Sequence, residues 1–408
     1  MNESVDVVVV GGGIAGGAIA SMLAARGLDV VVLERQHQFR DRVRGENMQP
    51  WGVLEMGRLG LEDVFVGAGG GYCERAVLYD ENISAADAEA TALPLGMLVE
   101  GAHGSFSVGH PQACEALLGE AERNGARVVR GVGDVDVTAG SPPQVSYELD
   151  GNLFDVRPRL VIGADGRQST VRRQLGMDLH REDSKASLAG LLVRDPNWPE
   201  ATEVLGTEDD VHFLVFPRPD GYVRLYLARL ESSVVGGAGS AERFLEGFRL
   251  TCCPPAESLI GAEVLGPCAT YRGSDSWTDR PFTDGVVLIG DAAGWSDPII
   301  GQGLAIALRD VRLVVDALAG DDWSVEAFEA YALERAERMR RLRMAGHVTT
   351  ELRCTFTPEG RRRRAGVLAG MMTDPATLAM LLAPLTGPEV APPEVFTAEN
   401  VERILSLT

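Results

Sequence analysis

The hydrophobic positions at the start of the chain form two valine-rich runs that flank a spaced pattern. Residues 5–10 end at three consecutive glycines, and residues 14–27 then place apolar side chains three and four positions apart before a final glycine. The segment 29–35, DVVVLER, repeats the valine-rich pattern. Such runs favour buried strands, and the spaced segment favours a helix. The order strand, glycine turn, helix, strand predicts a βαβ unit of a parallel sheet.

The rest of the chain mixes helical spacing with shorter strand patterns. From about residue 186 to 280 strands alternate, as in HFLVFPRPDGYVRLYLARL, where Pro219-Asp220-Gly221 predicts a hairpin turn. This block predicts an antiparallel sheet inserted into the parallel one. The other predicted elements are helices at 49–59 and 112–124, strands within 126–137, 144–156 and 160–162, a helix begun near Ser169, a long charged helix at 321–342, a helix near 374–383, a proline-rich joint at 388–393 and a last short helix.

Composition narrows the possible partners. The 408 residues carry a formal net charge of −21 and are 45% hydrophobic, as expected of a globular protein with two or three domains. A negative field of this size repels phosphate backbones, so we expect no nucleic-acid partner. The six cysteines show no CxxC spacing, which predicts reduced thiols in a cytoplasmic protein, and we expect no metal site.

An uncharged stretch from Val7 to Ala25 has the hydropathy of a signal peptide or a membrane span. Glu3 and Asp6 precede it where a signal peptide has basic residues, and five glycines interrupt it. We therefore expect no stable membrane insertion.

Three glycines separate the first strand from the first helix. Gly11, Gly13 and Gly16 follow the GxGxxG spacing, and Glu34 ends the second strand. The first glycine permits the turn, the second lets backbone N–H groups reach a pyrophosphate, and the third allows close helix–strand packing. Glu34 can accept hydrogen bonds from an adenosine ribose. The pattern predicts dinucleotide binding without distinguishing NAD from FAD. Ile14, Ala15 and Arg35, which are neighbours of these residues in the sequence, are also predicted to contact the dinucleotide.

Two later strand ends also carry an aspartate among small residues. GADGRQST at 163–170 places Asp165 after one strand, and GVVLIGDAAGWSDPIIGQGLAIAL at 285–308 places Asp291 after another. A long cofactor that runs along several strand ends accounts for all three acidic residues, Glu34, Asp165 and Asp291. This arrangement favours a flavin dinucleotide over a nicotinamide.

The second of these stretches has the residues that a flavin needs. Asp291 can accept hydrogen bonds from the ribityl chain, and the small residues 292–294 let the cofactor lie against the backbone. The following loop can direct a helix N-terminus at the isoalloxazine, where it stabilises negative charge at N1–C2=O. A buried strand with an N-capping aspartate is the structural alternative. The predicted contacts are Gly290, Asp291, Pro298, Gly301, Gly303 and Leu304.

GDAAGWSDPIIGQG, GADG and the N-terminal fingerprint together resemble the FAD-dependent monooxygenases of the para-hydroxybenzoate hydroxylase class, the group A flavoprotein monooxygenases. The resemblance covers about residues 1–345. It implies that Arg44 in RVRGENMQP contacts the pyrophosphate, that residues 46–48 approach the ring, and that Gln112 touches the cofactor. It also implies that Asp165 lies near the pyrophosphate and the nicotinamide route. Many members have histidine where Trp295 stands and asparagine where Ala305 stands.

The resemblance implies an α/β fold with a Rossmann-like parallel-sheet domain, an inserted and mainly antiparallel β domain, and a helical C-terminal region. The expected boundaries are 1–75, 100–185 and 281–345 for the FAD-binding domain, 76–99 and 186–280 for the substrate-binding domain, and 346–408 for the tail. The inserted sheet is expected to roof the cavity over the flavin. His212, Phe213, Phe216, Arg224 and Tyr226 alternate on its strands, so that only some of them face the cavity, and none is predicted to be catalytic.

The implied activity is an FAD-dependent monooxygenase that uses NADH or NADPH and O₂ to hydroxylate or epoxidise a small, aromatic or polycyclic substrate. Because the cofactor carries the chemistry, no protein residue is predicted to be catalytic. An FAD-dependent C=C reductase of the geranylgeranyl reductase type stays open, because such enzymes carry a similar GDAAG segment. A non-catalytic flavin sensor also stays open. A flavin halogenase is disfavoured, since Lys185 is the sole lysine and no WxWxIP segment occurs.

Overall fold

Parallel strands form the centre of the N-terminal sheet. The computed structural model describes residues 3–230, 240–320, 322–371 and 373–407. The strand order is β18-β19-β11-β1-β2-β8, and the pairs from β19 to β8 are parallel. The strands of this sheet are β1 (Glu3–Val10), β2 (Val30–Glu34), β8 (Arg127–Arg130), β9 (Val135–Thr138), β10 (Gln144–Leu149), β11 (Asn152–Gly163), β18 (Phe282–Thr283) and β19 (Val286–Leu288). The predicted βαβ unit is confirmed.

Long helices cover one face of this sheet, and a β-meander together with the short helix α6 (Thr170–Gln174) covers the other. Val7 and Val9 of β1 pack against helices, whereas Val8 and Val10 pack against the meander formed by β9, β10 and the start of β11. Because both faces of β1 are buried, its apolar residues are consecutive rather than alternate. The helices of the two faces are α1 (Ile14–Ala25), α5 (His110–Arg123), α6 (Thr170–Gln174) and α8 (Gly303–Ala317).

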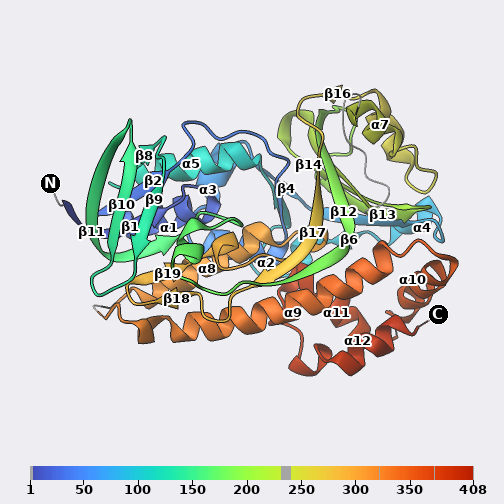
Figure 1. Cartoon of the computed structure of the whole chain (residues 1–408). Coiled ribbons are helices and arrows are strands. Elements are labelled where there is room, and N and C mark those ends of the chain that lie inside the picture. Colours follow the sequence, from blue (N-terminus) through green and yellow to red (C-terminus); the bar gives the residue numbers. More distant parts are fainter. Residues whose placement is uncertain (1–2, 231–239, 321, 372, 408) are drawn as a thin grey trace.

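The second large sheet is the predicted insert, and it lies beside the parallel sheet (Figure 1). Its order is β16-β12-β15-β14-β13-β5-β6, with β17 beside β12, and its pairs are antiparallel except β13 with β5. The predicted fold class is confirmed. The strands are β5 (Arg75–Asp80), β6 (Leu93–Pro94), β12 (His180–Arg194), β13 (Thr202–Glu208), β14 (Val211–Pro217), β15 (Tyr222–Leu230), β16 (Glu263–Val264) and β17 (Ala269–Trp277).

The two faces of the insert have different neighbours. The outer face, which includes Phe213, packs under α7 (Ser240–Glu246) and a 3₁₀ segment at Pro254–Gly261. The inner face carries Phe216 and Tyr226, which pack against Val43 of the N-terminal part of the chain. Phe213 therefore cannot roof a flavin, because alternate residues of a strand point to opposite faces.

A small third sheet connects the two large parts of the molecule. Its order is β3-β7-β4, and short helices follow its strands along the chain. The predicted helix at 49–59 is confirmed as α2. The elements here are β3 (Asn47–Met48), α2 (Pro50–Arg58), α3 (Glu62–Gly67), β4 (Gly71–Cys73) and β7 (Ser105–Ser107). The short helix α4 (Ala85–Ala90) packs instead on β5 of the insert.

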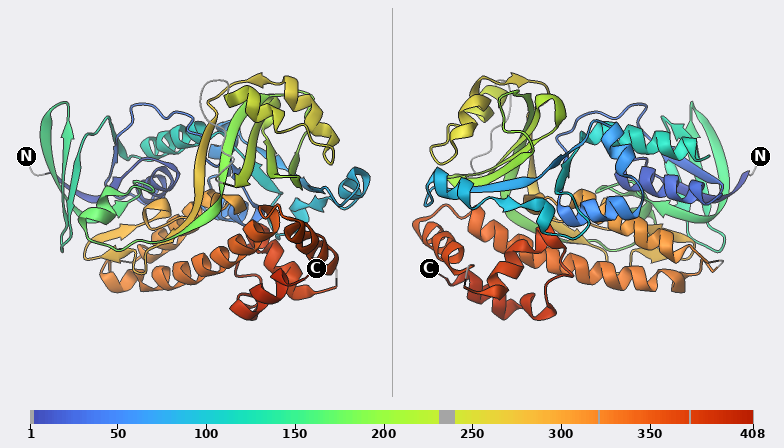
Figure 2. Two further views of the ribbon diagram at one scale, coloured as in Figure 1. Left: turned by 45° about the vertical axis from the view of Figure 1, so that its right-hand side comes forward. Right: turned by 180° about the vertical axis from the view of Figure 1, so that it is seen from behind.

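The helix predicted at 321–342 is displaced and longer. A 3₁₀ turn occupies Val325–Phe328, and α9 runs from Glu329 to Arg353. The helix continues because Ala345, Val348 and Leu352 pack into a separate core with the C-terminal helices. It lies beneath both large sheets, as Figure 2 shows from two further sides.

The C-terminal region contains one helix more than the sequence pattern predicts. Its helices are α10 (Pro358–Gly370), α11 (Pro375–Thr386) and α12 (Ala398–Leu405). Arg364 on α10 is buried, and it pairs with Asp80 at 2.6 Å and with Glu81 at 2.5 Å. Arg364 is therefore paired with acidic residues but buried, whereas an arginine in a charged run is usually solvated. Its pairing with acidic residues anchors α10 to the insert.

Membrane-spanning character is limited among the described residues. None of their helices alone combines the length and the apolar composition needed to cross a bilayer. Among the described helices, α10 and α11 reach this length and apolar composition only when they are taken together, and the chain bends by 100° between them.

Candidate functional site

The glycine turn leads into a helix N-terminus without a capping side chain. Gly11 has φ +99°, and a Cβ there would lie 2.6 Å from the carbonyl oxygen of Ala164. A Cβ on Gly16 would overlap the carbonyl oxygen of Gly11, whereas a Cβ on Gly13 would meet nothing within 4 Å. The first turn of α1 also holds no acidic residue. The free space at Gly13 and the positive helix end fit a bound phosphate.

Glu34 lies beside this turn, at the end of β2. Its Oε2 accepts a hydrogen bond from the N–H of Gly12 at 2.7 Å, and its Oε1 accepts one from the N–H of Gln36 at 2.7 Å. Glu34 is buried, while Arg35 next to it is exposed. The carboxylate is therefore held in place at the edge where the predicted ribose would bind.

Asp165 follows β11, which is the neighbour of β1 in the sheet. Its Oδ2 accepts hydrogen bonds from the N–H groups of Thr170, at 2.6 Å, and Val171, at 3.2 Å. Its Oδ1 is buried and accepts no hydrogen bond from the described residues. One oxygen thus orders the start of α6, and the other is available to a ligand.

Asp291 follows β19, the next strand of the same sheet. Its Oδ2 lies 3.3 Å from Nε of Arg167, whose guanidinium also lies over the ring of Trp295 with 5.4 Å to its centroid. Trp295 donates its indole N–H to Oγ of Ser274 at 3.1 Å. Arg167 was not predicted, although it lies within the quoted GADGRQST stretch.

The loop before α8 is held by side chains from distant elements. Gly301 has φ +64°, a conformation that favours glycine, and it closes the short turn Pro298–Ile300. Gln302 is fully buried, accepts the indole N–H of Trp51 at 2.7 Å and donates to the carbonyl of Pro384 at 3.0 Å. The N-terminus of α8 has no side-chain cap, and a Cβ on Gly303 would meet nothing within 4 Å. Leu304 behind it is buried.

Arg44 is presented by a loop that the insert holds down. The preceding Val43 is buried at φ +54°, a strained conformation for a β-branched residue. A Cβ on Gly190 of β12 would overlap Val43, and Tyr226 donates its hydroxyl to the carbonyl of Arg44 at 2.7 Å. Partial burial lowers the pKa of Arg44, nearby Arg167 lowers it further, and Asp291 raises it. Arg44 therefore shares the electrostatic environment of Asp291.

Glu46 is the centre of a buried ion-pair cluster that ties the same loop to sheet and helix. Arg224 on β15 donates to Glu46 at 3.0 and 3.2 Å and to Asp41 at 2.6 Å, and Nη1 of Arg218 lies 3.3 Å from Glu46. The N–H of His110 at the start of α5 also donates to Glu46, at 3.3 Å. Arg224 thus orders the loop.

The start of α5 carries the predicted Gln112. A Cβ on Gly109 would overlap both Oε1 of Gln112 and Nη1 of Arg218, so these two side chains flank Gly109. Burial, and then the positive charge of Arg44, lower the pKa of His110 to about 4. His110 is therefore neutral at physiological pH, and Arg44 supplies the positive charge here. Gln112 itself is exposed.

A buried charge cluster beneath residues 290–294 was not predicted. Asp310 on α8 accepts hydrogen bonds from the N–H of Gly290 at 2.9 Å, from Arg335 at 2.9 Å and from Arg338 at 2.7 Å. Arg335 also donates to the carbonyls of Gly290, Ala293 and Gly294 at 2.9–3.1 Å. The spacing of the two arginines, i and i+3 on one helix, was the available signal for a shared face. Arg335 and Arg338 are thus paired with an acidic residue and buried.

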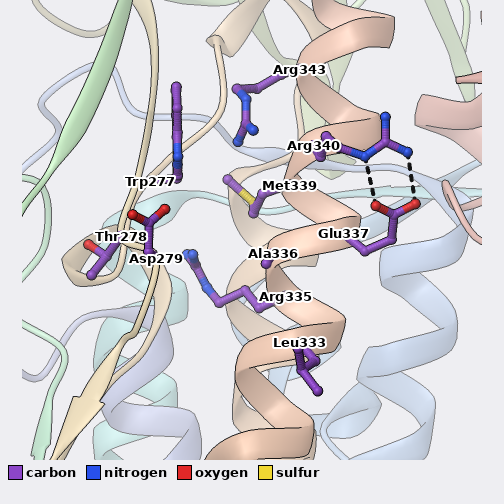
Figure 3. A pocket seen from close by; sticks show the side chains of 10 residues that line it. All are labelled: Trp277, Thr278, Asp279, Leu333, Arg335, Ala336, Glu337, Met339, Arg340 and Arg343. Carbon is purple, nitrogen blue, oxygen red and sulfur yellow. Dashed lines mark hydrogen bonds and ion pairs between the residues drawn. The ribbon is translucent and has the colours of Figure 1, made fainter. Parts of the chain in front are cut away.

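A surface pocket lies against α9. It has a volume of about 490 Å³ and lies between α9 and the end of β17 (Figure 3). Trp277 and Arg343 face each other across 3.8 Å, and Arg340 pairs with Glu337. None of the predicted cofactor residues lines this pocket, but Arg335, which supports residues 290–294, does.

The strand-end residues fit FAD. The space at Gly13 and the uncapped end of α1 suit the diphosphate, and the unpaired Oδ1 of Asp165 suits a donor on the cofactor. Asp291 and the end of α8 follow on neighbouring elements of the same edge. The assignment of each residue to a cofactor atom stays a prediction.

We expect Asp291→Ala to be purified nearly colourless, with FAD affinity about 10- to 100-fold lower, because a charge-assisted hydrogen bond to the ribityl chain is lost. The fold should persist, since the Asp291 carboxylate is partly exposed and its ion pair among the described residues is with Arg167. Flavin absorbance per protein and titration of the apoprotein with FAD measure this effect. Asp284→Ala, an exposed change at the other end of β19, is the control. Full flavin occupancy in Asp291→Ala would refute the ribityl contact.

Comparison with known proteins agrees with this geometry. The family described as FAD binding domain matches residues 4–345. Rifampicin monooxygenase of Streptomyces venezuelae is 27% identical over 343 residues, which cover 81% of this chain and 68% of the relative. 3-Amino-4-hydroxybenzoate 2-monooxygenase of Streptomyces cremeus is 27% identical, with 95% of this chain and 97% of the relative covered.

Reductases and solved structures are also similar. Digeranylgeranylglycerophospholipid reductase of Methanothrix thermoacetophila is 29% identical, with 80% of this chain and 81% of the relative covered. The structure of P. aeruginosa PqsL in complex with 2-aminobenzoylacetate has a TM-score of 0.73 at 22% identity and covers 90% of this chain and 100% of that one. The chain therefore belongs to the FAD binding domain family, and it is an FAD-dependent monooxygenase of the para-hydroxybenzoate hydroxylase class.

Proposed function

We propose that this enzyme inserts one oxygen atom into a small aromatic or polycyclic substrate, by hydroxylation or epoxidation, with NADH or NADPH as the reductant. For hydroxylation the reaction converts substrate, O₂, NAD(P)H and a proton into hydroxylated substrate, water and NAD(P)⁺. The observation that supports it is the alignment of Glu34, Asp165 and Asp291 at neighbouring strand ends, together with a family relative that matches nearly the whole chain.

Bound FAD supplies the redox chemistry of this reaction. The chain's own residues bind and orient it: the α1 terminus holds the diphosphate, Glu34 the ribose and Asp291 the ribityl chain. The uncapped N-terminus of α8 would stabilise negative charge on a flavin ring bound beside it. The inner face of the insert excludes water with apolar and aromatic side chains, including Leu214, Phe216 and Tyr226.

The division of labour between the parts of the chain is also a proposal. The FAD-binding domain comprises residues 1–75, 100–185 and 281–345, and the substrate-binding domain comprises 76–99 and 186–280. Residues 346–408 form a tail that packs through α10 on the insert. The proposed location is the cytoplasm, where NAD(P)H is available.

A second candidate function is reduction of a C=C bond by FAD. The digeranylgeranylglycerophospholipid reductase that matches 80% of this chain supports it. This reaction needs no O₂ and adds two hydrogen atoms to the substrate.

Stoichiometry separates the two functions. We expect the purified protein to be yellow and to oxidise NADH or NADPH in the presence of an aromatic or polycyclic substrate, with one O₂ consumed per product. Product formed under ¹⁸O₂ should carry one ¹⁸O atom. Turnover that proceeds without O₂ and yields a product heavier by two hydrogens would establish the reductase instead. Peroxide formation without product, measured across the panel, identifies compounds that bind without being oxygenated.

A further inference from the structure

Buried amide and carboxyl groups form a chain that begins beside the Gly301 turn. Nε2 of Gln49 would lie 4.0 Å from a Cβ on Gly301, and it donates to Oδ1 of Asn47 at 2.9 Å. Nδ2 of Asn47 donates to Oε2 of Glu203 at 3.0 Å, and the hydroxyl of Ser105 donates to the same oxygen at 2.6 Å. Gln49 is 4% exposed, Asn47 6%, and Glu203 0%. The chain thus joins the loop before α8 to the inner face of the insert.

The carboxylate of Glu203 determines which way the side-chain amides of Asn47 and Gln49 are turned. When Glu203 is ionised its Oε2 can only accept hydrogen bonds, so Asn47 directs its NH₂ group there and its oxygen toward Gln49. Gln49 then uses its own NH₂ group on Asn47 and presents Oε1 at the end of the chain. That oxygen is buried and receives no hydrogen bond from the described residues. A buried acceptor without a donor is unfavourable, which points to a donor supplied by a ligand.

Apolar side chains lie near the Glu203 end of this chain of hydrogen bonds. Leu205 stands two residues after Glu203 on β13, and Phe216 and Tyr226 share the inner face of the insert with it. Beside apolar side chains such as these, one placed polar group can fix the orientation of a ligand. Cys73 on β4 is the titratable neighbour of Glu203 on the small sheet, and burial raises its pKa far above its usual range, so it stays neutral.

We propose that Oε1 of Gln49 accepts a hydrogen bond from an N–H or O–H group of a ligand bound between the Gly301 turn and the insert, with Asn47 and Glu203 as positioning residues. This inference rests on the proposed function. The donor has two possible sources: the imide N–H of the flavin ring, or a hydroxyl or amino group on the substrate. The second source would restrict the substrate to phenol-like or aniline-like rings.

The central test replaces Gln49 by Leu, and by Met, which keeps the length of the side chain but lacks the acceptor. Apoprotein is titrated with FAD, and holoenzyme is titrated with a panel of phenols and anilines, each paired with its O-methyl or N,N-dimethyl analogue. Changes in flavin absorbance report binding. Asn197→Leu, at an exposed amide in the loop between β12 and β13, is the matched control.

If the flavin imide is the donor, both Gln49 variants should bind FAD about tenfold more weakly. If the substrate is the donor, FAD affinity should stay within twofold, and the preference of wild type for a phenol or aniline over its methylated analogue should fall about tenfold. If the variants retain wild-type FAD affinity and no compound pair is discriminated differently from wild type, the inference is overturned. A wild-type protein that binds no FAD would instead refute the proposed function.

The role of Glu203 has its own readout. Burial raises the pKa of Glu203 to about 7, against the lowering effect of its hydrogen bonds to Ser105 and Asn47. Its charge therefore appears as pH rises from 6 to 8, and it polarises the amide chain toward a stronger acceptor. The affinity for the donor should increase about threefold over this range, whereas Glu203→Gln, which keeps the hydrogen bonds without the charge, should be flat. Identical pH profiles for both proteins would show that Glu203 has only a structural role.

Discussion

We expect Asp310→Ala to lower the free energy of unfolding by about 3–5 kcal/mol, the usual cost of leaving one member of a buried ion pair without its partner. The change leaves the guanidinium groups of Arg335 and Arg338 buried without their shared carboxylate. It also removes the acceptor for the N–H of Gly290. Burial alone would raise the pKa of Asp310, but the two arginines keep it below its usual value, so the carboxylate is charged in the native protein.

The same substitution should loosen the cofactor site. Residues 290–294 are held from below by Arg335, which Asp310 orients, and Asp291 lies within this stretch. We expect weaker FAD binding in addition to a lower melting temperature. Asp316→Ala is the matched control on α8, because its pair with Arg312 is exposed and contributes less than about 1 kcal/mol. Chemical denaturation and FAD titration measure both effects, and equal stabilities of the two variants would refute the structural role of the cluster.

Two alanine substitutions in the glycine turn should have different consequences. Gly16→Ala should destabilise the apoprotein by about 1–3 kcal/mol, because its Cβ would overlap the carbonyl of Gly11. Gly13→Ala should leave apoprotein stability nearly unchanged, since its Cβ would extend into open space. Both variants should bind FAD at least about tenfold more weakly, Gly13→Ala because the methyl group occupies the place of the diphosphate.

The comparison of the two variants isolates the binding site from the fold. Thermal unfolding of the apoproteins gives the difference in stability, and fluorescence titration with FAD gives the two affinities. Wild-type affinity in Gly13→Ala would show that the diphosphate lies elsewhere. A stable apoprotein for Gly16→Ala would show that helix α1 can move away from the turn without loss.

Local patterns were sufficient for the elements that carry the site. The valine-rich runs, the glycines between them and the helical spacing after them correspond to β1, α1 and β2. The aspartates after the later strands, Asp165 and Asp291, lie after β11 and β19, which neighbour β1 in the sheet. These predictions succeeded because a buried parallel strand and a tight turn each restrict the residues at consecutive positions.

Patterns were insufficient where a helix or a charge depends on a distant partner. The end of α9 could not be placed, because residues 343–353 stay helical only through packing with α10, α11 and α12. The buried state of Arg224, Arg335 and Arg364 was missed for the same reason, since their acidic partners stand 25 to 284 positions away. Arginine in a charged stretch is usually solvated, and only the fold shows the exceptions.

The sequence by itself determined the βαβ start, the three acidic strand ends and the family, because each is written in contiguous residues whose sizes and conformations are restricted locally. The tertiary structure alone decided how these ends are supported: Asp310 and Arg335 beneath residues 290–294, and Glu46 with Arg224 behind the Arg44 loop. With 38 basic and 59 acidic residues, the chain allows very many charge pairings. Burial selects among them, because a charge removed from water is tolerated only where its partner is already in place.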